Sequence, residues 1–122
     1  MKLAILILGA IAAAPLGASA TTLPADTPVP ARLTLLPANG PVGRVNPFYR
    51  GYSPVFAFAG SKAQVVCEIE LIGGEERVAP GQTVDVHLRC AEAVTVDGDA
   101  PTFVFREGGH KVGEGELRLT AR

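Results

Sequence analysis

Apolar and polar residues alternate with a period of two along most of the chain after residue 30. Such alternation is typical of β-strands that bury one face and expose the other. Six segments show it, and glycine, proline or aspartate residues that favour turns separate them. They are residues 31–35, 56–58, 65–71, 84–90, 103–106 and 112–121. No segment in this region has the pattern of a helix, so the sequence predicts an all-β domain.

The spacing of these strands suits a small barrel or a sandwich. A barrel is favoured because closure removes the exposed edges that an open six-stranded sheet would present. Turn signals at Pro80-Gly81 and Gly108-Gly109 separate neighbouring strands. We therefore expect a six-stranded antiparallel barrel of the Greek-key type over residues 31–122.

The first 20 residues have a different character. Lys2 precedes an unbroken apolar run from Leu3 to Ala14, and Ala18-Ser19-Ala20 places small residues where a signal peptidase requires them. The run is shorter than the ~20 residues that a membrane-spanning helix needs, so a retained membrane helix is the weaker interpretation. We expect residues 1–20 to be a cleaved signal peptide and the protein to be periplasmic or secreted, with no membrane span after cleavage.

Residues 21–30 carry three prolines and little that could pack, which indicates an extended tether before the domain. Removal of residues 1–20 takes away Lys2 and changes the formal net charge from −1 to −2. The remaining basic residues are scattered. Because nucleic-acid binding depends on clustered Lys and Arg residues, a nucleic-acid partner is disfavoured.

Two cysteines, Cys67 and Cys90, fall on inward positions of their predicted strands. In an exported protein a disulfide between them is the default interpretation, and two buried thiols that never pair are the alternative. Two cysteines and two histidines are few for a tetrahedral metal site, which takes about four ligands. We find no nucleophile–base set and no phosphate-binding G-x-x-x-x-G-K-[ST] loop, so we expect no catalytic residue, metal, cofactor or nucleotide.

Three motifs lie in one order along the domain: RVNPFYRGYSPVFAF at 44–58, APGQTVDVHL at 79–88 and FVFREGGHKVGEGEL at 103–117. Together they resemble the C-terminal β-barrel domain of the elongation factor Tu family, where a strand ends in Arg-Glu-Gly-Gly and returns through Val-Gly-x-Gly. The resemblance covers residues 31–122 and implies a six-stranded antiparallel barrel. In that family the barrel is the third domain of a GTPase, and it contacts aminoacyl-tRNA and the nucleotide exchange factor.

The resemblance implies candidate contact residues, and it also shows departures. Arg44, Glu107 and Gly108 match positions that the family uses against tRNA, whereas Val45 and Asn46 replace a His and a Thr of the loop. His110-Lys111 replaces the Arg-Thr after the double glycine. The tip formed by residues 107–111 is therefore either a contact hairpin or a turn that simply needs glycines.

Phe48, Tyr49 and Tyr52 cluster in the long loop before the second strand. Loop aromatics often mark interaction surfaces, but these could also fold back as a lid over one end of the barrel. Together with Arg44 and with Glu107, Gly108, His110 and Lys111 of the hairpin tip, they are our candidate partner-binding residues.

The preferred hypothesis is a non-catalytic exported binding module whose partner is an unknown envelope or secreted protein. One alternative is an elongation-factor-like domain that contacts RNA or a GTPase. Another is a small exported enzyme or metal protein.

Overall fold

The computed structural model describes residues 20–119, which form strands and loops without a helix. Most of the predicted signal peptide, residues 1–19, lies outside this range. The strands are β1 (Ala20–Leu23), β2 (Pro28–Leu35), β3 (Phe48–Tyr49), β4 (Val55–Phe58), β5 (Gln64–Leu71), β6 (Arg77–Val78), β7 (Thr83–Cys90), β8 (Val94–Asp97), β9 (Thr102–Glu107) and β10 (His110–Leu117). Within residues 20–119 there is accordingly no helix that could cross a lipid bilayer.

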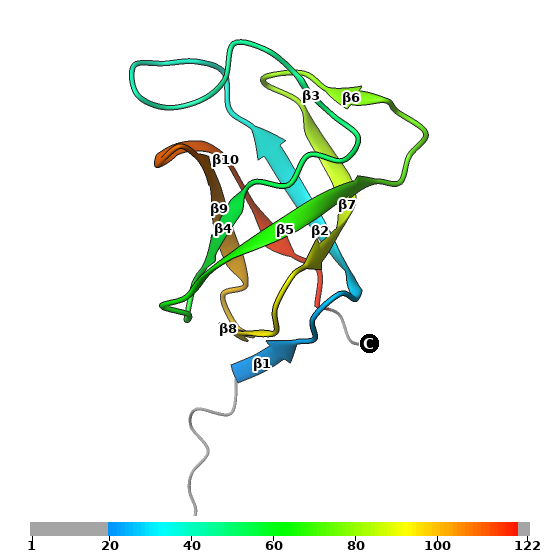
Figure 1. The fold of residues 1–122 in the computed structure, drawn as a ribbon, viewed down its shortest axis with the longest axis vertical. Helices are drawn as coiled ribbons and strands as arrows, with labels where there is room; N and C mark the ends of the chain where they lie inside the picture. The colour runs from blue at the N-terminus through cyan, green and yellow to red at the C-terminus, as the bar shows by residue number, and fades with distance from the viewer. Residues whose placement is uncertain (1–19, 120–122) are drawn as a thin grey trace, which may run out of the picture.

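Six of the strands close into an antiparallel barrel in the order β10-β2-β7-β5-β4-β9, which confirms the predicted architecture (Figure 1). Every neighbouring pair is antiparallel, so each strand exposes one face to solvent and buries the other. Closure leaves none of these six strands with a free edge. The last strand ends at Leu117 rather than at the expected Ala121.

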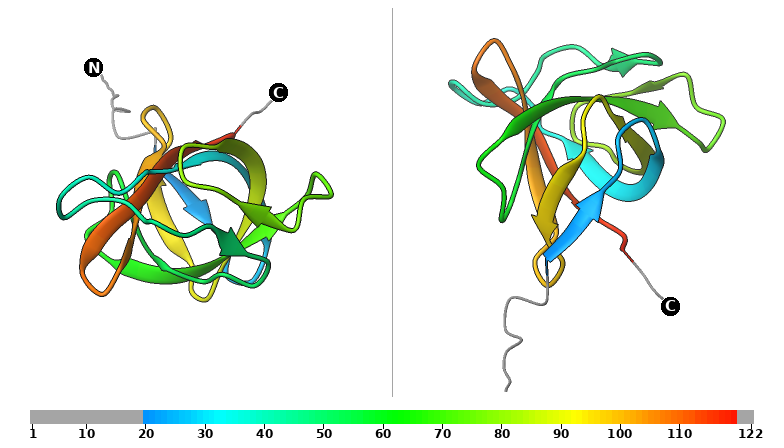
Figure 2. Two further views of the ribbon diagram at one scale, coloured as in Figure 1. Left: turned by 90° about the horizontal axis from the view of Figure 1, so that it is seen from above. Right: turned by 60° about the horizontal axis from the view of Figure 1, so that its bottom comes forward.

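The two ends of the barrel are covered by the remaining four strands (Figures 1 and 2). At one end, β3 pairs with β6 and buries Phe48 and Val78. At the other end, β1 pairs with β8 and buries Leu23, Val94 and Val96. We refer to these as the β3–β6 end and the β1–β8 end. Both two-stranded sheets thus extend the core beyond the six barrel strands.

The segment expected to be a tether is part of this arrangement. Residues 20–23 form β1, where Leu23 is only 2% exposed, and residues 28–30 are the first three of β2. The barrel therefore begins at Pro28 rather than at Ala31. The three prolines misled the prediction, because a proline is tolerated in a strand wherever its missing N–H would have no partner.

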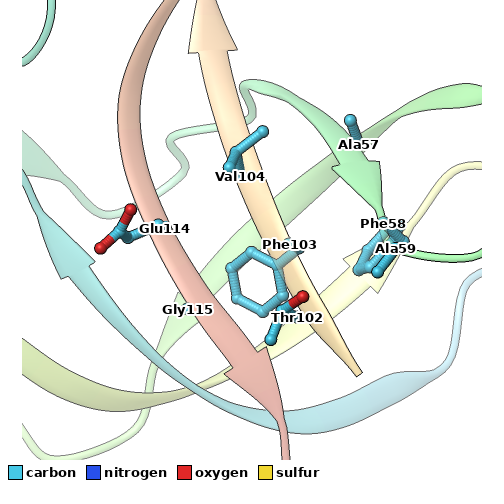
Figure 3. Close-up of a pocket in the computed structure, with 8 residues that line it drawn as sticks. All are labelled: Ala57, Phe58, Ala59, Thr102, Phe103, Val104, Glu114 and Gly115. Atoms are coloured by element: carbon cyan, nitrogen blue, oxygen red, sulfur yellow. The ribbon is translucent and has the colours of Figure 1, made fainter. Parts of the chain in front are cut away.

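The last strand contains two glycines that leave room for aromatic rings. Gly113 faces Phe105 and Gly115 faces Phe103 across the β9–β10 pair. A Cβ atom on Gly113 would lie 2.0 Å from Cζ of Phe105, and one on Gly115 would lie 2.2 Å from the carbonyl oxygen of Arg32. Figure 3 shows the Phe103 ring lying next to Gly115. The Val-Gly-x-Gly motif is thus explained by packing.

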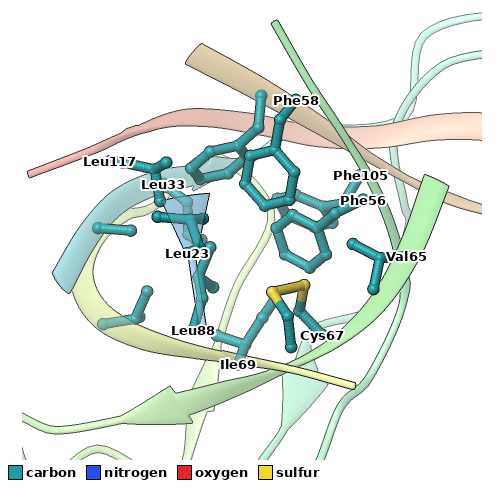
Figure 4. Packing of buried hydrophobic residues seen from close by; sticks show 14 of the residues in the cluster. Leu23, Leu33, Phe56, Phe58, Val65, Cys67, Ile69, Leu88, Phe105 and Leu117 are labelled. Carbon is teal, nitrogen blue, oxygen red and sulfur yellow. A yellow bond between two sulfur atoms is a disulfide. The ribbon is translucent and has the colours of Figure 1, made fainter. Parts of the chain in front are cut away.

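The barrel interior is filled by aromatic and aliphatic side chains and a disulfide (Figure 4). Phe56 lies at the centre of the aromatic group, with ring centroids 5.3 Å from both Phe103 and Phe105. Cys67 on β5 and Cys90 on β7 are directly opposite each other, with Cα atoms 3.9 Å apart, and their sulfur atoms are at bonding distance. Their burial and register support the predicted disulfide over two separate thiols.

Candidate interaction surface

The long loop between β2 and β4 lies beside the tip of the β9–β10 hairpin. Backbone hydrogen bonds fix this position: the N–H of Leu36 donates to the carbonyl oxygen of Val112 at 2.9 Å, and the N–H of Gly43 donates to that of Lys111 at 2.9 Å. Both segments lie at the β3–β6 end (Figure 1). All of the predicted partner-binding residues are therefore gathered at one end of the barrel.

Three of these residues form a half-buried polar cluster, which we call the loop anchor: Arg44, Tyr52 and Glu107. The Arg44 guanidinium and the Tyr52 hydroxyl both donate hydrogen bonds to one oxygen, Oε2 of Glu107. Arg44 also donates to the carbonyl oxygens of Asn46 and Pro47, at 3.0 and 3.1 Å. The loop anchor ties the loop to the end of β9, so its polar groups are already engaged within the domain.

The aromatic residues of the loop divide into two groups. Phe48 is buried and stacks on Tyr52 with ring centroids 4.7 Å apart. The edge of the Tyr52 ring packs against Phe105 of the core, with ring centroids 6.4 Å apart. These two side chains form the lid that was one of the two alternatives for the cluster. Tyr49 points outward and is 55% exposed, whereas Tyr52 is half-buried, so Tyr49 offers the largest free surface of the three.

The hairpin tip is a tight turn with few contacts of its own. Gly108 and Gly109 have φ values of 55° and 90°, which only glycine adopts without strain. His110 is exposed, and the Lys111 ammonium lies 2.8 Å from a carboxylate oxygen of Glu114. The glycines are thus explained by the turn, whereas His110 and Lys111 remain accessible beside the loop.

Two exposed apolar residues, Val45 and Ile72, were not among the predicted partner-binding residues. The residues from 20 to 119 include four large apolar side chains with high exposure: Val45 (79%), Tyr49 (55%), Ile72 (49%) and Val66 (45%). Val45 and Ile72 lie in connections at the β3–β6 end and Tyr49 lies on β3, whereas Val66 lies on β5. The replacement of a family His by Val45 was a signal that could have been used, since it puts an apolar side chain in a loop.

Two of the hollows on the surface of residues 20–119 are relevant to binding. One, of about 450 Å³, lies between the loop and the hairpin tip, and it is lined by Ala38, Gly40, Pro41, Val42, Gly43, Val45 and His110. The other, of about 600 Å³, lies across β4, β9 and β10 (Figure 3). Its lining is mostly small or apolar and has one ionisable side chain, Glu114. We call the first one the loop hollow.

No group of three metal-ligating side chains lies close together anywhere in residues 20–119. His87, one of the two histidines, stands opposite Glu70 on the outer face of the barrel. Both cysteines are taken up by the disulfide.

Residues 25–120 match the family model of the elongation factor Tu C-terminal domain. The chain belongs to this family. In the elongation factor Tu C-terminal domain family the barrel is a non-catalytic domain, and the six-stranded closed barrel found here agrees with that membership. Of the family positions that match in this chain, Arg44 and Glu107 bind each other within the loop anchor.

The pKa of Tyr52 shows whether the loop anchor is formed. Burial, and then the hydrogen bond to the Glu107 carboxylate, raise the pKa of Tyr52 well above its ordinary value of about 10. An unfolded chain releases this proton near pH 10, while the folded chain holds it to higher pH. Tyr52 therefore stabilises the fold fully below pH 10, and this contribution is lost as the pH rises through the raised pKa.

We expect a Tyr49→Phe variant, which keeps Tyr52 as its one tyrosine, to form no phenolate near pH 10 while folded. Absorbance at 295 nm measures this without interference, because the chain has no tryptophan. Adding Glu107→Gln removes the charge next to the phenol and should lower the Tyr52 pKa. A titration midpoint near 10 in the folded Tyr49→Phe protein would contradict the loop anchor.

Proposed function

We propose that this protein is an exported, non-catalytic β-barrel module that binds another protein of the cell envelope or the extracellular medium. The observation that carries the proposal is that three of the exposed apolar side chains, Val45, Tyr49 and Ile72, lie at the β3–β6 end. Exposed apolar and aromatic side chains grouped on one surface are typical of protein interfaces. The loop anchor holds part of this surface in place, which lowers the entropic cost of binding.

The link to an exported compartment rests on two separate features. The first 20 residues have the charged, apolar and small-residue pattern of a signal peptide. The buried Cys67–Cys90 disulfide is of a kind that persists in oxidising compartments. Mass spectrometry of the exported form should find a chain that starts at Thr21. An intact leader on protein recovered from the cytosol would contradict export.

An RNA contact domain, surviving from the role of the barrel in elongation factor Tu, is the less favoured function. The chain after residue 20 carries a formal charge of −2, and Arg44 is neutralised by Glu107. RNA binding depends on cations that are free to displace counterions. A protein partner requires no such excess of positive charge.

The surface is tested by capturing the partner from an envelope fraction with a photo-crosslinker at Ile72. A Tyr49→Ala change should weaken capture by roughly tenfold or more, as expected when an aromatic anchor is truncated. Tyr52 is left intact because its removal would release the loop anchor. Val66→Ala, which truncates an exposed side chain on the outer face of β5, is the matched control and should have no effect. Equal capture by the Tyr49→Ala protein would refute the surface.

A further inference from the structure

Two cations stand directly opposite each other at the tip of the β9–β10 hairpin. Arg106 on β9 is the register partner of Lys111 on β10. Like charges at such a position repel and destabilise a hairpin. Lys111 is partly neutralised by Glu114, but no carboxylate within the part of the chain that the structure describes lies within 4.0 Å of Arg106. The domain therefore keeps an unfavourable charge pair on an exposed turn.

Lys111 lies next to the loop hollow, because it follows the lining residue His110, and Arg106 lies one strand further away. The strand register places Val55, Arg106 and Lys111 side by side across the outer face of β4, β9 and β10. The hydrogen bond from Gly43 to Lys111 extends this row to the loop, and Gly43 itself lines the hollow. The strand that borders the hollow thus carries Lys111, and the strand next to it carries Arg106.

The hollow itself is suited to an apolar group. Its lining consists of small and aliphatic residues with one ionisable side chain, His110, and the highly exposed Val45 stands at its rim. Val45 loses contact with water when a partner covers it, and burial of this apolar surface favours binding. Apart from His110, the lining residues belong to the loop that the backbone bonds and the loop anchor hold against the hairpin.

We propose that the loop hollow and the neighbouring cations form a binding site for an acidic, extended segment of a protein partner. A medium-sized apolar side chain of that segment enters the hollow, and flanking carboxylates lie over Arg106, Lys111 and His110. The proposal rests on the proposed function, since it names the chemistry of the partner at the same end of the barrel. A polyanion such as RNA is disfavoured, because two or three cations give it little counterion release.

Fluorescence anisotropy with defined peptides tests the site. The probe is a fluorescein-labelled decapeptide with a central leucine flanked by aspartates. It should bind the wild-type domain at least about tenfold more tightly than the same peptide with serine at the centre or with lysines at the flanks. Binding should weaken as salt is raised, because the carboxylates face exposed cations.

Variants separate the two halves of the site. Val45→Ser should weaken binding of the leucine peptide about fivefold without changing its salt dependence. Arg106→Gln should weaken it severalfold and reduce the salt dependence. Val66→Ser and Lys62→Gln are the matched controls, since they change an exposed valine and an exposed lysine away from the hollow. They should leave binding unchanged.

Equal binding of all three peptides would overturn the site, and so would tighter binding of a single-stranded RNA decamer. These results are distinguishable from failure of the proposed function. Suppose the acidic leucine peptide does not bind, but Tyr49→Ala still weakens capture of an envelope protein. The module then binds proteins through the Tyr49 side of the surface, and the acidic-segment site is wrong. If no envelope protein is captured and the acidic peptide also fails, both proposals fall.

Discussion

Replacing both cysteines with alanine should lower the free energy of unfolding of the domain by about 3 kcal/mol. The disulfide joins β5 to β7 across a sequence separation of 23, so its loss restores conformational freedom to the unfolded chain. Both sulfur atoms also fill the core, where Cys67 is fully buried and Cys90 is 3% exposed, so the change leaves a small cavity as well. Urea unfolding monitored by circular dichroism measures the difference.

Reduction provides a control that leaves the side chains in place. A wild-type chain that is unfolded, reduced with dithiothreitol and then refolded should show most of the same decrease in the free energy of unfolding. The folded protein should resist reduction because the disulfide is buried. The oxidised form should weigh two hydrogens less than the dithiol. Identical unfolding midpoints for the oxidised and double-alanine proteins would show that the disulfide contributes nothing to stability.

Leu23→Ala should destabilise the domain by about 3 kcal/mol, which is within the range for a buried leucine. The Leu23 side chain is 2% exposed and closes the β1–β8 end against the barrel core. Its loss removes the main apolar contact of β1, so we also expect proteases to cleave within residues 21–27 more readily. Denaturant unfolding and limited proteolysis measure the two effects.

Thr22→Ala is the matched control for this change. Thr22 lies on the same strand with its side chain toward solvent, and its one side-chain contact is an exposed pairing with Thr95 at 3.3 Å. Its replacement should cost less than about 0.5 kcal/mol. If Leu23→Ala is as mild as Thr22→Ala, residues 21–27 behave as the tether that the sequence suggested and β1 is not part of the stable fold.

The six barrel strands could be predicted because their signal is local. Inward residues such as Val65, Cys67 and Ile69 alternate with outward residues, and the same period recurs in the other long strands. Alternation assigns a face to each side chain whatever the partner strand is. The inward positions of Cys67 and Cys90 followed from the same rule, although their direct opposition did not.

The candidate site was predicted in part. The loop and the hairpin tip were both identified, and the structure brings them together. The sequence offered no way to see that Arg44, Tyr52 and Glu107 bind one another, since Glu107 is separated from the other two by more than 50 positions. It also gave no indication that Phe48 would be buried while Tyr49 stays exposed, because a loop has no fixed period to assign its faces.

By itself, the sequence determined the all-β class, the barrel strands and the inward or outward direction of their side chains, because a period of two is set by each strand's own backbone. Only the tertiary structure decided that β1 and β8 close one end, that β3 and β6 close the other, and that the loop after β2 forms a hollow next to the β9–β10 hairpin. Each of these depends on segments far apart in the chain, and their contacts exist only once the barrel has brought them together.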